Sequence, residues 1–239
     1  MIKTLLLLLK AGKLGKVLLT SGTMLLSILT YSLVYGWRYA VGVVGLIFCH
    51  EMGHYLAARQ RGLDVGAPTF IPFVGAWIQL KDLPHDVETE AYIGIAGPVI
   101  GSLAALLCYW TGLAQSSNLL LALAFSGFMI NLFNLIPLAP LDGGRITAIV
   151  SPKLWLLGAP ILVGVFLWRP SPLLVVIALL AAPQLFRAFS NKEPDEAHKR
   201  YYDVALRTRA EYGAWYLGLA GLLAVLAYEV HMKLQPGAV

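Results

Sequence analysis

The clearest chemical pattern in the chain is the pentapeptide His-Glu-Met-Gly-His at residues 50–54. On a helix, side chains four residues apart lie on one face one turn apart, so His50 and His54 can bind a single metal ion. Glu51 would then stand beside that ion, placed to take a proton from a bound water and pass it to a leaving amine. The alternative is two helix-surface histidines beside a solvated glutamate. The apolar run before them, residues 41–49, disfavours that alternative, because ionisable groups in such a segment are costly and usually functional.

Zinc suits this chemistry, because it accepts imidazole nitrogen and carboxylate oxygen and lowers the pKa of a bound water to about 7. A catalytic zinc site uses three protein ligands and keeps one position open. Asp142 is the best candidate for the third ligand, because it follows an apolar segment and two prolines that end or kink a helix. Gly143 and Gly144 come next and are expected to let the backbone turn tightly. Without the histidine motif, an ordinary loop turn would be the better interpretation of this Asp-Gly pair.

The elements that position these residues are predicted to be membrane helices. Hydrophobic residues make up 58% of the 239 residues and charged residues only 13%, whereas a soluble domain carries about 25% charged residues. The formal net charge is +5, which we interpret as basic residues that set membrane topology, with the lipid bilayer as partner and no nucleic acid. The two cysteines, Cys49 and Cys108, lie in or beside apolar runs and do not predict a disulfide.

Seven apolar segments approach the length of about 20 residues that a spanning helix needs. They are residues 17–35, 37–58, 90–111, 118–135, 154–168, 172–189 and 212–231. The fifth is short, and it could pair with the sixth as a tight helical hairpin. Residues 69–80 are apolar, β-rich in composition and broken by Pro and Gly, which predicts a short hairpin or a re-entrant loop.

The predicted fold class is therefore an all-α polytopic membrane protein with about seven transmembrane helices and a small membrane-associated β-hairpin. We expect one integral membrane domain over residues 1–239, with a catalytic core at about 37–145 and additional helices at 154–189 and 212–231. Residues 190–211 form the only clearly soluble long stretch, and this stretch is too small to be a separate domain.

The distribution of positive charge predicts the orientation of this multi-pass protein. With a cytoplasmic N-terminus, all of the 18 Lys and Arg residues except Arg38, Arg169 and Lys233 fall on the cytoplasmic side, as the positive-inside rule expects. The C-terminal ends of the second and fourth spans then both face the cytoplasm. Asp142 can meet the two histidines there, which places the active site toward the cytoplasmic side.

The histidine motif, together with Asn-x-x-Pro-x-x-Pro-Leu-Asp-Gly-Gly at residues 134–144, resembles the site-2 protease family of intramembrane zinc metalloproteases. The resemblance covers residues 41–145. It implies one zinc ion bound by His50, His54 and Asp142, with Glu51 as the catalytic base. It also implies that Asn134 holds the substrate or the developing oxyanion. Residues 70–80 look like the family's membrane-embedded β element, to which an unwound substrate could add as a strand.

The resemblance implies a zinc-dependent metalloendopeptidase that hydrolyses a peptide bond within or near a transmembrane segment of a membrane-protein substrate, in regulated intramembrane proteolysis. One alternative is a non-proteolytic metal-binding membrane regulator or binding module, which has no need of Glu51. Another is a membrane zinc protease whose third ligand is a later glutamate, Glu211 or Glu229. A transporter is a further alternative. It would be expected to have two related halves, and the sequence shows no such symmetry. The oligomeric state is unknown at this point.

Three further residues near the motifs have alternative roles. Asn131 lies about one helical turn before Asn134, so we expect it either to hydrogen-bond between helices or to help the site. Gly97 and Gly101 have the G-x-x-x-G spacing, which favours close helix packing.

Overall fold

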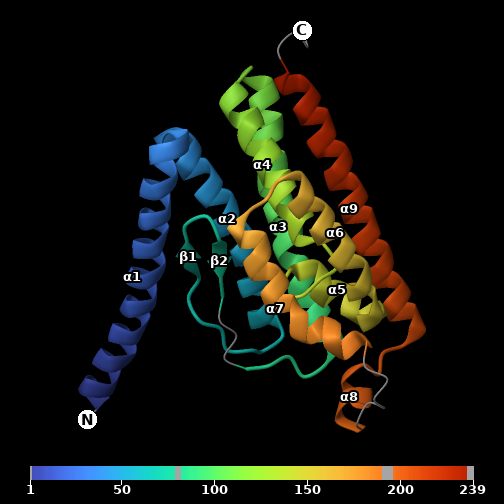
Figure 1. Ribbon diagram of the computed structural model, residues 1–239. Coiled ribbons are helices and arrows are strands. Elements are labelled where there is room, and N and C mark those ends of the chain that lie inside the picture. Colours follow the sequence, from blue (N-terminus) through green and yellow to red (C-terminus); the bar gives the residue numbers. More distant parts are fainter. Residues whose placement is uncertain (1, 79–81, 190–195, 236–239) are drawn as a thin grey trace.

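The computed structural model describes residues 2–78, 82–189 and 196–235. Within these ranges the regular secondary structure consists of helices and one two-stranded hairpin (Figure 1). The helices and strands in chain order are α1 (Ile2–Tyr35), α2 (Trp37–Gln60), β1 (Thr69–Ile71), β2 (Gly75–Trp77), α3 (Val87–Ala114), α4 (Asn118–Asn134), α5 (Asp142–Val150), the short 3-10 helix η1 (Pro152–Leu154), α6 (Trp155–Trp168), α7 (Pro172–Phe189), α8 (Glu196–Tyr201) and α9 (Leu206–Leu234).

Each of the seven predicted apolar segments is a helix, which makes the chain a multi-pass membrane protein. By length and composition, four of the described helices could cross a membrane: α1 from Gly15 onward, α2, α3 and α9. The other three segments form the shorter apolar helices Asn118–Asn134, Pro152–Trp168 and Pro172–Phe186.

The core of the protein is a bundle of α2, α3, α4 and α9 (Figure 1). Val44 of α2, Phe128 of α4 and Leu223 of α9 are fully buried in one cluster. The packing is close because small residues lie where the helices approach. At Gly53 of α2, for example, an added Cβ would collide with the backbone of Ala96 on α3. A side chain there would push the two helices apart.

The predicted hairpin is present and lies between α1 and α2 (Figure 1). β1 and β2 are antiparallel, and Phe70 is opposite Ala76 in the register. The turn between the strands includes Phe73 at φ 62° and ends at Gly75 at φ 120°. The positive φ at position 75 favours glycine, because residues with a side chain rarely adopt this region of φ and ψ. Residues 79 and 80, the end of the predicted segment, lie outside the described residues.

Helix α1 holds the outer edge of the hairpin through polar side chains in an otherwise apolar helix. The backbone N–H of Phe70 donates to Thr23 Oγ1 at 3.2 Å. The N–H of Phe73 donates to the hydroxyl of Tyr31 at 3.0 Å. These bonds satisfy backbone donors that would otherwise face lipid.

The segment that carries Asp142 differs from its prediction. Gly143 and Gly144 do not form a tight turn: both are helical residues in the first turn of α5, and neither has a positive φ. Glycine is needed at both positions because the backbone of the preceding loop lies too close for a side chain. An added Cβ at Gly143 would collide with the backbone of Leu135, and one at Gly144 with the backbone of Ala139. The two glycines therefore let α5 lie directly against the loop that leads into it.

Helices α6 and α7 pack together over this loop, as the expected helical hairpin. Ile136, Leu138 and Leu141 of the loop form a hydrophobic cluster with residues of both helices, among them Leu162 of α6 and Ile177 of α7. The loop before Asp142 is thus covered by apolar side chains, which fixes where α5 begins.

Helix α8 is a short element inside the stretch that was predicted to be soluble. The hydroxyl of Tyr201, its last residue, donates to Glu90 Oε2 of α3 at 2.6 Å. Burial, followed by the Glu90 carboxylate, raises the pKa of Tyr201. The phenol therefore stays protonated and able to donate to Glu90 over the physiological pH range.

Candidate metal centre

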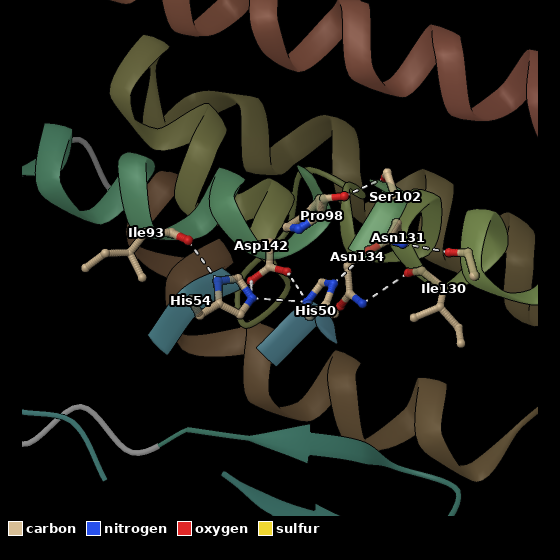
Figure 2. A network of polar contacts seen from close by, with 10 residues as sticks. His50, His54, Ile93, Pro98, Ser102, Ile130, Asn131, Asn134 and Asp142 are labelled. Carbon is tan, nitrogen blue, oxygen red and sulfur yellow. Dashed lines mark hydrogen bonds and ion pairs between the residues drawn. The ribbon is translucent and has the colours of Figure 1, made fainter. Parts of the chain in front are cut away.

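Two helices bring the predicted ligands together: α2 carries both histidines, and Asp142 is the first residue of α5. Their side chains converge in Figure 2, where both imidazoles turn toward the carboxylate. His50 Nε2 lies 3.1 Å from His54 Nε2. The Asp142 oxygens lie 3.1 Å from His50 Nε2 and 3.3 Å from His54 Nε2. All three residues are buried, with exposed fractions of 4%, 8% and 7%.

The hydrogen bonds on the far side of each ring fix which nitrogen carries the proton. His50 Nδ1 lies 2.7 Å from Asn131 Oδ1, and His54 Nδ1 lies 2.8 Å from the carbonyl oxygen of Ile93. Amide and carbonyl oxygens only accept, so each Nδ1 must donate. In the neutral imidazoles, both Nε2 atoms are then unprotonated and present lone pairs to the centre.

Three electron-rich groups therefore face one another in a buried space. Asp142 Oδ2 has no hydrogen-bond partner among the described residues, although it is shielded from solvent. Such an arrangement is repulsive by itself and becomes favourable when a cation binds between the ligands. Two ligands at about 2.0–2.1 Å from a tetrahedral ion lie about 3.3 Å apart, close to the distances between these atoms. The residues present fit a zinc ion.

The helix contacts around His54 explain how α3 supports the site. An added Cβ at Gly97 would collide with the His54 imidazole, so only glycine lets the ring lie against α3. The next glycine of the spacing, Gly101, lies in the same way against the amide of Asn131. The predicted packing role of these glycines is confirmed, and it serves the metal centre. Pro98 of α3 has no backbone N–H, so one backbone hydrogen bond of this helix is missing. The gap lies close to Ile93, whose carbonyl accepts the hydrogen bond from His54 Nδ1.

Glu51 follows His50 on α2 and is 8% exposed. Its carboxylate makes no hydrogen bond or ion pair with the part of the chain that the structure describes. Structural carboxylates at such depth are normally paired, so an unpaired one beside a metal-ligand set is suited to exchanging protons with a substrate or water.

The two asparagines of α4 have different hydrogen-bond partners. Asn134, expected to act in catalysis, donates its Nδ2 to the carbonyl of Ile130 at 3.0 Å and makes no described contact with a ligand (Figure 2). Asn131 instead contacts His50 directly, so the expected hydrogen bond between helices is present. Its position one helical turn before Asn134 was the sequence signal for this contact.

The alternative third ligands are engaged elsewhere. Glu211 forms an ion pair with Arg207 at 2.8 Å, and Glu229 accepts a hydrogen bond from Tyr109 at 2.6 Å. Among the described residues, the group that could hold a metal consists of the two motif histidines and Asp142. This geometry favours Asp142 over either glutamate.

Two cavities have volumes of about 420 and 330 Å³, and both are lined by Glu90 and Arg145. The smaller cavity also touches Trp77 at the end of β2 and Ile93, whose carbonyl holds His54. The larger lies beside α8 and is lined by Tyr201.

Comparison with known proteins agrees with this geometry. The sequence model of the family described as peptidase family M50 matches residues 38–117, which include both histidines and Glu51. Over these residues the chain is similar to peptidase family M50. A zinc metalloprotease of Methanocaldococcus jannaschii is 31% identical over 134 residues, or 54% of this chain and 38% of that protein. An Arabidopsis thaliana protein named "Probable zinc metalloprotease EGY1, chloroplastic" is 34% identical over 84 residues, or 33% of this chain and 15% of that protein.

One solved structure also aligns with this chain. The structure titled "Site-2 Protease from Methanocaldococcus jannaschii" covers 76% of this chain and 87% of its own, with 23% identity and a TM-score of 0.44. The alignments with the two sequence relatives span less than two fifths of either relative's length.

Proposed function

We propose that the chain is an intramembrane zinc metalloendopeptidase that hydrolyses a peptide bond within or near a transmembrane segment of a membrane protein, as in regulated intramembrane proteolysis. The observation that carries the proposal is the convergence of His50 Nε2, His54 Nε2 and the Asp142 carboxylate next to the unpaired Glu51. The apolar helices that hold these residues and the similarity of residues 38–117 to peptidase family M50 support it.

The zinc ion would be held by His50, His54 and Asp142. When bound, it supplies Lewis-acid chemistry that makes water a nucleophile near neutral pH and polarises a carbonyl. Two imidazoles and one carboxylate leave a position of the ion for a non-protein ligand, which is the arrangement of catalytic rather than structural zinc sites.

Glu51 then acts as the proton carrier. Its carboxylate takes a proton from the attacking water while the water oxygen bonds to the carbonyl carbon of the substrate. As the carbon–nitrogen bond breaks, Glu51 gives that proton to the leaving amine, so atoms and charge balance. Burial of Glu51 beside the ligand set keeps competing waters few.

Asn134 is proposed to stabilise the oxyanion. One N–H of its side-chain amide is occupied by the Ile130 carbonyl. A primary amide has two N–H groups, so the other remains available as a donor. A single such donor typically contributes about 10²–10³ in kcat.

The free edge of β2 is the proposed docking place for an unwound substrate. The N–H of Phe70 points toward Thr23 on α1, so Phe70 and its register partner Ala76 form a pair whose backbone groups point away from each other. The backbone groups of Ala76 therefore point off the opposite edge of the hairpin. Residues around this edge, including Trp77, line the smaller cavity, which also touches Ile93. A substrate strand added there would have its backbone satisfied at membrane depth.

The orientation is proposed from the charge distribution: seven spans, a cytoplasmic N-terminus and an active site toward the cytoplasmic side. Of the 18 Lys and Arg residues, only Arg38, Arg169 and Lys233 oppose this arrangement.

Zinc titration of purified protein tests the ligand set. The wild type should bind one zinc ion per chain, and Asp142→Ala should lose tight binding, because two imidazoles alone leave the ion under-coordinated. Retention of tight, stoichiometric zinc by Asp142→Ala would point to a different third ligand. Comparing wild-type membranes with Glu51→Gln membranes for single-pass proteins that accumulate would then identify substrates.

A further inference from the structure

Asn131 is the one side chain in the described part of the protein that hydrogen-bonds the outer nitrogen of a proposed metal ligand. Its Oδ1 lies 2.7 Å from His50 Nδ1, and the residue is 2% exposed. It comes from α4, whereas His50 comes from α2, so the contact joins two helices of the core.

The amide of Asn131 is held in one orientation by its surroundings. Its Nδ2 donates to the carbonyl of Gly127 at 2.7 Å, which directs Oδ1 rather than Nδ2 toward the imidazole. On the other side Gly101 of α3 offers no Cβ, and one placed there would collide with this amide. Helices α2, α3 and α4 therefore contribute together to the placement of a single acceptor behind His50.

That acceptor selects the form of His50 that can bind a metal. A neutral imidazole with a proton on Nε2 has no lone pair to offer toward Asp142 and His54. An acceptor on Nδ1 stabilises the opposite tautomer and fixes the rotation of the ring. His54 receives the same support from the main-chain carbonyl of Ile93, which side-chain mutagenesis cannot remove.

We propose that Asn131 is a positioning residue that holds His50 with Nε2 free and aimed at the metal, so that its loss weakens zinc binding. The inference rests on the metal site of the proposed function. It assigns to Asn131 a role different from that proposed for Asn134, three residues away on the same helix.

The test is a comparison of zinc affinities in full-length detergent-solubilised protein, measured by competition with a chromogenic chelator. Asn131→Leu keeps the approximate volume and removes the acceptor, so its zinc dissociation constant should rise about 10- to 100-fold. Asn131→Asp restores an acceptor for the Nδ1 proton and should bind zinc close to the wild-type affinity. The matched control, Asn134→Leu, should leave zinc affinity unchanged, because Asn134 hydrogen-bonds the Ile130 carbonyl and not a proposed ligand.

A purely structural hydrogen bond between helices would give a different pattern. In that case Asn131→Leu would lower the thermal stability of the metal-free protein, while the zinc affinity of the folded fraction stayed at the wild-type value. That result overturns the proposal. If instead the wild type itself bound no zinc, the proposed function would fail at its own first step.

A measurement on the wild type covers the case in which Asn131→Leu does not fold. In metal-free protein labelled with ¹⁵N-histidine, the ring nitrogen shifts report the tautomer of each histidine, and His50→Gln assigns the His50 signal. We expect the Nδ1-protonated form for His50. A predominant Nε2-protonated form would contradict the role assigned to Asn131.

Discussion

Gly97→Ala is a small change that should disable the metal centre through packing alone. Residue 97 lies on α3 and contributes no ligand or hydrogen bond to the site. Its new methyl group would occupy the space of the His54 imidazole and collide with three ring atoms. The ring is 8% exposed and held at Nδ1 by the Ile93 carbonyl, so it has little freedom to move aside.

The size of the effect follows from the space required. To reach ordinary van der Waals contact, the ring must retreat by about 1 Å, whereas a metal site tolerates about 0.2 Å in its ligand distances. We expect zinc affinity to fall by at least about tenfold, as for loss of an outer-shell contact. Misplacement by about 1 Å costs about 100-fold in rate. Overpacking a tight helix contact also costs about 1–3 kcal/mol of stability.

The assay combines chelator competition for zinc with thermal unfolding in detergent. The matched control is Gly45→Ala on α2, where an added Cβ meets no atom within 4 Å. It should leave zinc affinity unchanged and, if anything, stabilise the helix by up to about 1 kcal/mol. Wild-type zinc affinity and stability in Gly97→Ala would refute the reasoning that His54 is positioned by contact with α3.

Three further predictions concern the role of Asn134 in catalysis, the docking of α8 and the attachment of the hairpin to α1. Asn134→Leu should keep its zinc but lower kcat by about 10²–10³, which single-turnover cleavage of a transmembrane peptide would measure; unchanged kcat would remove Asn134 from the site. Tyr201→Phe should release α8 by deleting the bond to Glu90, a loss of about 1 kcal/mol seen as faster hydrogen exchange in residues 196–202. Because the pKa of Tyr201 is raised, wild-type docking of α8 should persist to about pH 10 and weaken above it as the phenol ionises; equal exchange in both proteins would count against this contact. Thr23→Val should speed exchange of the Phe70 amide, which it leaves without an acceptor; slow exchange in the variant would show that α1 does not hold β1.

The ligand set could be predicted from the sequence because each ligand follows from a local rule. The spacing of His50 and His54 places both on one helix face, and the unusual position of Asp142 between apolar segments marked it as a ligand. The seven apolar segments were sufficient to place α1, α2, α3, α4, α6, α7 and α9, and the Pro- and Gly-broken run at 69–80 to place the hairpin.

The contacts behind the ligands could not be predicted in the same way, because they depend on how helices pack. Asn131 and Asn134 lie on the same helix three residues apart, and only the rotation of α4 against α2 decides which one reaches His50. Likewise, Gly143 and Gly144 were expected to turn the chain. They are instead helical, because α5 packs against the backbone of the preceding loop.

Helix α8 also depends on contacts with residues that are distant in the sequence. Helix α8 was not predicted because residues 196–201 have no apolar periodicity. It is held in place by the bond from Tyr201 to Glu90 and by a hydrophobic cluster that includes Tyr202 and Ala91. Such short elements are stabilised by tertiary packing rather than by their own helix propensity.

The most direct test of the central claim is cleavage of a single-pass membrane substrate by wild-type and Glu51→Gln protein reconstituted in liposomes, with zinc content measured in the same samples. Glu51→Gln keeps the size of the side chain and leaves the ligands His50, His54 and Asp142 untouched. We expect equal zinc content in both proteins and a cleavage rate for Glu51→Gln that is lower by about 10²–10⁴, the usual contribution of a general base. Cleavage by Glu51→Gln at the wild-type rate would contradict it.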